Sequence, residues 1–330
     1  MTAVRAEWLH RFMLLGSSIV GALLLAEVAL RVLGIGYPVF SRPDDERGWV
    51  LRPGARGRYE AEGSALVEIN RDGLRDRDHS RAKPAGTLRI AVLGDSYAGA
   101  LEVRMEETFW SVLERNLNRS AAPHGRQVEV VNFGVRGYGT AQELLTLRCC
   151  VWDYSPDVVL LAFYSGNDVS DNSPVLDHGA TRYARPYLAA TDTGWSVDRS
   201  FQRSRRYRTG KLVSGLIAHS RLLQLGNRVQ NLMLRRRTGT PVAGGAGWLD
   251  ADIVVDPPIY MEAKDEAWST AWRTTEDLVA TMGREVSERG ARFAIISITN
   301  PKPNSRKRIR AFHPSVALPC VLVFQHRFCG

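Results

Sequence analysis

A chain of 330 residues is long enough for one large domain or two modest ones, and 44% hydrophobic with 24% charged residues excludes wholesale disorder. The formal net charge of +9 is compatible with a nucleic-acid partner, but the sequence contains no signature of a nucleic-acid-binding module. The basic residues are instead concentrated in RSRRYR (203–208), LRRR (234–237) and the C-terminal region. We therefore interpret them as solvated faces or membrane-proximal patches and predict no nucleic-acid partner.

The N-terminal segment reads FMLLGSSIVGALLLAEVAL over residues 12–30 and is interrupted only by Glu27. As a helix it would be about 28 Å long at ~1.5 Å per residue, close to the thickness of the hydrocarbon core of a bilayer. We predict that residues 1–36 form a single-pass membrane anchor, with a signal peptide as the alternative. Arginines flank both ends of the segment, so their distribution does not decide its orientation.

Residues 37–86 follow as a connector rich in Pro, Gly and Arg, with a strand candidate at 65–70. From residue 88 the pattern alternates between strand, turn and helix, which favours a parallel sheet covered by helices on both faces. The predicted strands are 88–93, 128–133, 157–163 and 292–298, and the predicted helices are 108–118, 141–148 and 266–288. The sequence thus predicts an α/β protein, a three-layer α/β/α sandwich preceded by a transmembrane helix.

An insertion divides this predicted core into two parts of the sequence. Its first part covers 87–169, and 170–264 reads as an insertion with polar loops, the basic cluster and one helix candidate at 212–233. The core resumes at 265–300, and 301–330 form an atypical basic tail.

The four cysteines indicate neither a disulfide framework nor a zinc site. Cys149 and Cys150 are adjacent, while Cys320 and Cys329 lie close to the C-terminus, so the closely spaced ligand pairs of zinc sites are missing. We predict small buried side chains or free thiols.

Each of the first three core strands ends in a polar turn. These turns contain Gly94-Asp95-Ser96, the stretch NFGVRG at 132–137, and SGND at 165–168. Because the carboxyl ends of parallel strands lie at one edge of a sheet, we expect a serine hydroxyl, glycine N–H groups and an asparagine amide to converge there. A nucleophile and oxyanion donors are the parts that acyl transfer needs. The alternative for the first turn is a purely structural one, a capped strand-to-helix turn. A dinucleotide-binding loop is not indicated, because its glycine spacing is absent.

The three turns resemble, in order and spacing, the first three sequence blocks of the SGNH/GDSL hydrolase superfamily: LGDSY, NFGVRGYG and GND, over roughly residues 88–170. The resemblance implies a flavodoxin-like sandwich and hydrolysis of ester bonds through an acyl-enzyme, without a metal or organic cofactor. It assigns Ser96 as the nucleophile and places its own N–H, the Gly137 N–H and the Asn167 amide in the oxyanion hole. Gly134 is the second choice for the glycine donor.

The resemblance makes Asp95 and Asp168 residues that fix turns rather than proton carriers. The partner it implies is a small-molecule, glycan or lipid ester.

The fourth block of that family, an aspartate three residues before a catalytic histidine, is missing. No acidic residue follows Glu288, and the late histidines His313 and His326 are weak candidates for the base. An Asp-x-x-His does occur at Asp76–His79, but it precedes the serine, and we interpret it as a charged surface turn. The acid-free, Arg-rich sequence after about residue 300 is what a frameshifted or prematurely terminated reading frame would produce.

We therefore predict a membrane-anchored serine ester hydrolase with its catalytic domain outside the cytoplasm, impaired by the missing Asp/His block. The first alternative is a catalytically silent SGNH-like binding or scaffold domain at the membrane. The second is an O-acyltransferase acting on a cell-envelope glycan.

Overall fold

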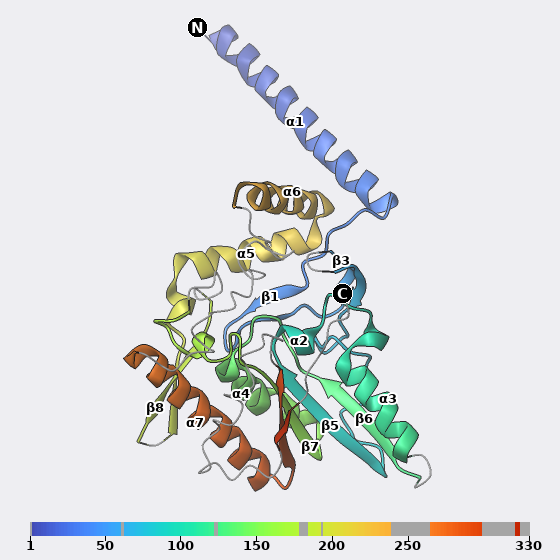
Figure 1. Cartoon of the computed structure of the whole chain (residues 1–330). Helices are drawn as coiled ribbons and strands as arrows, with labels where there is room; N and C mark the ends of the chain where they lie inside the picture. Colours follow the sequence, from blue (N-terminus) through green and yellow to red (C-terminus); the bar gives the residue numbers. More distant parts are fainter. Residues whose placement is uncertain are drawn as a thin grey trace.

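A computed structural model of the chain describes residues 2–60, 63–121, 125–177, 184–192, 194–238, 265–298 and 321–323 (Figure 1). Its centre is a five-stranded parallel sheet in the order β11-β10-β7-β5-β6. The strands are β5 (Thr87–Gly94), β6 (Gln127–Asn132), β7 (Val158–Tyr164), β10 (Arg292–Ile298) and β11 (Val321–Val323). The predicted α/β class with a parallel sheet is thereby confirmed, and β11 adds a strand that the sequence did not predict.

Helices cover both faces of this sheet. Side chains of β5 alternate: Ile90 and Val92 pack with α3 (Phe109–Ala121), whereas Ala91 and Leu93 pack with α4 (Thr140–Cys149) and α7 (Glu266–Glu288). Alternation along one strand buries both faces because successive side chains point in opposite directions. Each of the three predicted core helices exists: α7 has the predicted bounds, and the ends of α3 and α4 are shifted by one to three residues.

Two short hairpins precede the core. β1 (Ser41–Asp44) pairs with β2 (Gly48–Leu51), and β3 (Arg56–Tyr59) pairs with β4 (Ala65–Glu68), all antiparallel. They enclose a second apolar cluster that includes Trp49 and Tyr138. The Trp49 indole donates to the Arg136 carbonyl at 3.0 Å, and the Tyr138 hydroxyl donates to the Trp49 carbonyl at 2.6 Å. The predicted connector is thus a packed subdomain resting on the core.

The segment predicted as an insertion contains more structure than expected. A hairpin of β8 (Tyr187–Thr191) and β9 (Gly194–Asp198) lies where we expected polar loops. The single helix expected over 212–233 is wrong: α5 (Arg205–His219) and α6 (Arg221–Thr238) are separated at Ser220. The break occurs because the first N–H groups of α6 bind Glu27 of α1 (Thr2–Val32) instead of carbonyls of α5.

The adjacent cysteines also differ from the prediction. Cys149 and Cys150, at the end of α4, form a disulfide with each other, so the expectation of free thiols is wrong for this pair. Cys320 and Cys329 lie outside the described residues.

Helix α1 projects away from the rest of the chain (Figure 1). Its stretch Glu7–Val32 is long and apolar enough to cross a bilayer, with a mean hydropathy of 2.1, and its most apolar window is entirely unburied. A signal sequence would meet the same criterion.

A buried arginine on β5 links this strand to β6 and to the loop carbonyls of Arg81 and Tyr154, and its removal should cost stability. The Arg89 side chain is fully buried and donates to Glu129 Oε2 at 2.7 and 2.9 Å and to the carbonyls of Arg81 and Tyr154. Arg89→Met should lower the free energy of unfolding by about 2–4 kcal/mol, because buried acceptors lose their donors. Denaturant titration measures this loss.

The matched control is Arg56→Met, which breaks an exposed Arg–Glu pair between β3 and β4. It should change the free energy of unfolding by no more than about 0.5 kcal/mol. Equal losses in the two variants would contradict the structural role assigned to Arg89.

Candidate active site

The strand order creates a topological switch point at β5. From β5 the chain crosses to β6 on one side and then to β7 on the other. In open α/β sheets the crevice between two strands whose connections diverge, at their carboxyl ends, is where ligands bind. Ser96 follows β5 and Asn167 follows β7, so the two strands beside this crevice end in predicted site residues.

The turn after β5 is fixed by Asp95. Its carboxylate caps α2 (Ser96–Gly99), accepting the Tyr97 N–H at 3.0 Å, and the Ser96 hydroxyl donates to its other oxygen at 3.4 Å. Gly94 allows the close approach to β7, since a Cβ there would lie 3.1 Å from the Ala162 Cβ. Ser96 is therefore held at the strand end with 7% of its surface exposed.

The turn after β6 packs directly against the first. The Asn132 side chain donates to the Ala98 carbonyl at 3.0 Å and accepts the Gly134 N–H at 3.0 Å. Gly134 is thus already engaged. Gly137 has φ +74°, a backbone conformation that glycine adopts without strain, and no described residue accepts its N–H. Of the two glycines considered as donors, Gly137 keeps its N–H available.

The turn after β7 is held by its own carboxylates. Asp168 accepts the Tyr164 N–H at 2.7 Å, and the Asn167 amide donates to Asp171 Oδ2 at 3.1 Å. One amide hydrogen of Asn167 is used in this way, which leaves the second for another acceptor. The rings of Tyr97 and Tyr164 lie 4.7 Å apart, so this turn also contacts the first.

Behind the three turns lies a cluster of buried carboxyl groups. Burial raises the pKa of Asp95 and of Asp171 to about 7, against the hydrogen bonds that each carboxylate accepts. Burial, together with neighbouring acidic groups, raises the pKa of Asp168 and Glu143 well above the usual range. Among the described residues neither oxygen of Glu143 has a hydrogen-bond partner. The cluster therefore holds protons at pH values where exposed carboxyls are ionised.

One buried arginine faces this cluster. Arg185 pairs with Asp171 at 3.0 Å and with Asp177 at 2.8 Å. Burial lowers the pKa of Arg185, but the two carboxylates outweigh that effect and raise it overall. We did not predict Glu143 or Arg185 from the sequence. The available sequence signal for Glu143 was its place as the single acid of the helix TAQELLTLRC; the structure shows that residues 140–147 of this helix are all buried.

The prediction for Asp76 and His79 is wrong. We expected a charged surface turn, but the two side chains are almost fully buried, with His79 Nε2 3.1 Å from Asp76 Oδ2. The same Asp76 oxygen accepts the Asn132 N–H at 2.9 Å. The pair thus fastens the connector to the end of β6, beside the second turn.

No histidine hydrogen-bonds to Ser96 within the described ranges, where Asp95 is the side chain that contacts the hydroxyl. The candidate bases His313 and His326 lie outside the described residues. Nor does the described part of the chain contain three His, Cys, Asp or Glu side chains placed to hold a metal ion.

Comparison with known proteins gives likenesses among solved structures. No family model and no curated protein matches the chain. It is similar to TesA (13% identity, 69% of this chain and 72% of that one, TM-score 0.30) and to a lipase from a goat rumen metagenome (13%, 72% and 79%, TM-score 0.33). A third is a GDSL-like lipase from Bacteroides thetaiotaomicron (11%, 72% and 65%, TM-score 0.29). These similarities are distant, and the site described above rests on its own geometry.

The buried carboxyls predict how stability depends on pH. Their native pKa values lie above the unfolded ones, so the native state binds more protons, and the free energy of unfolding should fall as pH rises from about 4 through about 7. Glu143→Gln removes one of these groups without changing its shape. It should raise the free energy of unfolding at pH 8 by about 1–3 kcal/mol and leave pH 4 nearly unchanged. Urea titrations at both pH values measure the effect.

Glu288→Gln, at the exposed end of α7, is the control and should leave the pH dependence as in the original chain. A Glu143→Gln protein with the original pH dependence would show that Glu143 ionises freely, contrary to its described burial.

Proposed function

We propose that the chain is a serine ester hydrolase of the SGNH/GDSL type, with Ser96 as the nucleophile. The observation that carries the proposal is the position of Ser96 and Asn167 at the carboxyl ends of β5 and β7, on either side of the switch point. Ligand sites of open α/β sheets occur at this place. The turn after β6 adds Gly137, whose N–H has no acceptor among the described residues.

In the proposed reaction Ser96 Oγ attacks the ester carbonyl carbon, and its proton passes to a base. The tetrahedral oxyanion accepts hydrogen bonds from the Ser96 and Gly137 N–H groups and from the Asn167 amide. Collapse releases the alcohol and leaves an acyl group on Ser96, which water then removes. The carboxylate of Asp95 holds the turn and orients the hydroxyl.

A serine hydroxyl is a weak nucleophile until a base takes its proton. His313 and His326 remain the candidates for that base. The substrate class is a small-molecule, glycan or lipid ester, and we place the domain outside the cytoplasm, anchored through α1.

One observation favours a second function. Within the described residues the Ser96 hydroxyl donates to a carboxylate and not to a histidine. A domain that binds esters at the membrane without turnover would have this arrangement. Binding of an ester without its hydrolysis would identify this alternative.

The test of the nucleophile is hydrolysis of 4-nitrophenyl acetate by the full chain in detergent. Ser96→Ala should abolish the activity above background, because it removes the hydroxyl proposed to form the acyl-enzyme. Ser287→Ala removes an exposed hydroxyl from α7 and should leave the rate unchanged. Equal rates for the original chain and Ser96→Ala would reject catalysis by Ser96 and favour the silent domain.

When Ser96 is shown to act, His313→Ala and His326→Ala test the base. Loss of a catalytic base costs on the order of 10⁴-fold or more in turnover. The variant with that loss identifies the base, and unchanged rates in both would remove these two histidines as candidates.

The oxyanion role of Asn167 has its own test. Asn167→Ala should lower kcat about 10²- to 10³-fold with little change in KM, because the lost hydrogen bond forms mainly in the transition state. Ser170→Ala is the matched control, since it removes a 3.2 Å hydrogen bond to the Asn167 carbonyl within the same turn. A similar fall of kcat in both variants would mean that the turn, and not the amide, matters.

A further inference from the structure

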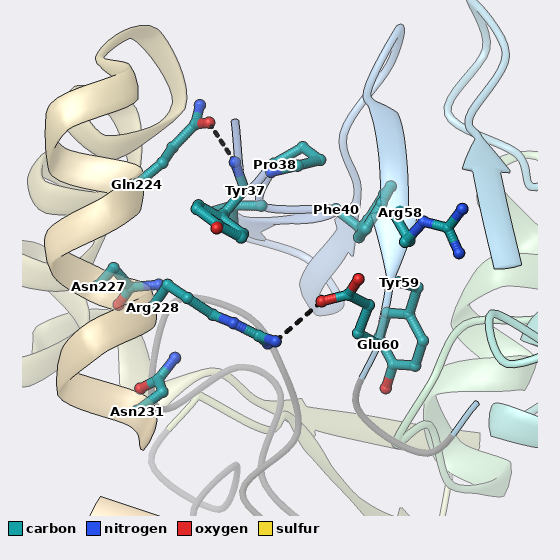
Figure 2. Close-up of a pocket in the computed structure, with 11 residues that line it drawn as sticks. Tyr37, Pro38, Phe40, Arg58, Tyr59, Glu60, Gln224, Asn227, Arg228 and Asn231 are labelled. Carbon is teal, nitrogen blue, oxygen red and sulfur yellow. Dashed lines mark hydrogen bonds and ion pairs between the residues drawn. The ribbon is translucent and has the colours of Figure 1, made fainter. Parts of the chain in front are cut away.

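Helix α6 has its polar side toward the protein and its apolar side toward the surroundings. Figure 2 shows Gln224, Asn227, Arg228 and Asn231 facing the chain around Tyr37, with Gln224 accepting the Tyr37 N–H at 3.0 Å. Gln224 and Asn231 are each only 4% exposed. Exposed Val229 and Met233, four residues apart, lie on the opposite side, and exposed Leu223 and Leu232 flank it. This is the reverse of a helix that covers a core in water.

Helix α5 also exposes apolar residues, although its buried side contains Tyr207 and Ile217 as well as Ser214. Ser214 is 1% exposed and accepts a hydrogen bond from Arg52, whereas Leu212 is 73% and Leu216 61% exposed. Leu212, Val213 and Leu216 lie at helical spacing and form one outward stripe. The described residues leave both stripes uncovered, although grouped apolar side chains of this size normally mark a contact surface.

The corner between α5 and α6 is bonded to α1 through Glu27. Its carboxylate accepts the Arg221 N–H at 3.0 Å, the Leu222 N–H at 2.9 Å and the Ser220 hydroxyl at 2.9 Å. Arg31, which pairs with Glu27, also donates to the His219 carbonyl at the end of α5. The single acid of the apolar segment therefore ties the corner to the helix predicted to enter the membrane.

The hydrogen bonds to Glu27 fix the depth at which the corner lies relative to a bilayer crossed by α1. Glu27 lies five residues before the end of α1 at Val32 (32 − 27 = 5), and hence about 8 Å back from that end at ~1.5 Å per residue. An amphipathic helix at a bilayer surface lies about 5–10 Å into the boundary between headgroups and acyl chains. When α1 spans a bilayer, the corner thus lies at the level of that boundary.

The charges of the two helices fit the same surface. Neither sequence, RRYRTGKLVSGLIAH or RLLQLGNRVQNLMLRRRT, contains an acidic residue. Exposed Arg205, Arg206 and Arg208 lie near the start of α5. A basic helix with an apolar side is typical of binding to anionic lipid.

We propose that α5 and α6 lie in the surface of the membrane that α1 crosses, with their exposed apolar residues among the lipid chains and the arginines near the start of α5 at anionic phospholipid headgroups. The proposal rests on the membrane anchoring proposed above and does not depend on catalysis. It gives the chain a second membrane contact, and α2 with Ser96 lies on the side of the sheet that faces α5 (Figure 1).

The experiment is photo-crosslinking of the full chain, reconstituted into vesicles of phosphatidylethanolamine and phosphatidylglycerol that contain an alkyne-bearing phospholipid. The photoreactive p-benzoylphenylalanine replaces Leu216 or Met233 in the two stripes, one position at a time. Replacement of Leu24 in α1 reports whether the anchor is inserted. Replacement of Val175, which is 66% exposed and lies outside α1, α5 and α6, gives the background.

We expect lipid adducts at Leu216 and Met233 at a yield comparable with Leu24 and well above Val175. Adducts at Leu24 with none at Leu216 and Met233 would overturn the inference and leave the anchor intact. A missing adduct at Leu24 would reject the anchor and the inference with it. A crosslinked dimer in place of lipid adducts would show that a second copy covers the stripes, which also overturns it.

Discussion

The close packing of three turns at one edge of the sheet is the constraint on which the rest of the structure depends. Gly94 and Gly134 both lie against Ala98, where a Cβ on either glycine would come within 2.8 Å of the alanine Cβ. The backbone hydrogen bond from Val135 to the Gly94 carbonyl, at 3.1 Å, joins the same two turns. Ser96 can therefore not shift without moving both neighbouring strand ends.

This packing costs free energy because it buries carboxyl groups. Asp95 and Asp168 must lie inside to cap the backbone of their turns, and burial then raises the pKa of each. Arg185 offsets part of the cost through its two ion pairs, but Glu143 has no such partner. Buried carboxyl groups with strongly raised pKa values are common at functional sites. Here such a cluster lies directly behind the turn that carries Ser96.

The sequence predicted the parallel sheet, its flanking helices and the place of the three turns, because all of these follow from local apolar runs and their polar ends. It did not predict the buried Asp76–His79 pair, since an Asp-x-x-His in a polar stretch resembles a surface turn until its partner Asn132 is known. Nor did it predict β11 or the Cys149–Cys150 disulfide, which depend on contacts that periodicity does not encode.

The α5–α6 segment shows most clearly why pattern alone was insufficient. Helical periodicity predicts that a helix has an apolar side, but it does not say whether that side faces the core or the surroundings. The apolar run over 212–233 therefore looked like one continuous helix. Glu27 decides the outcome, because its carboxylate satisfies the first N–H groups of α6 and so permits a helix start within the run. An acid that would be costly in lipid by itself thus holds a hydrogen-bonded corner, and both helices present exposed apolar residues on their outer sides.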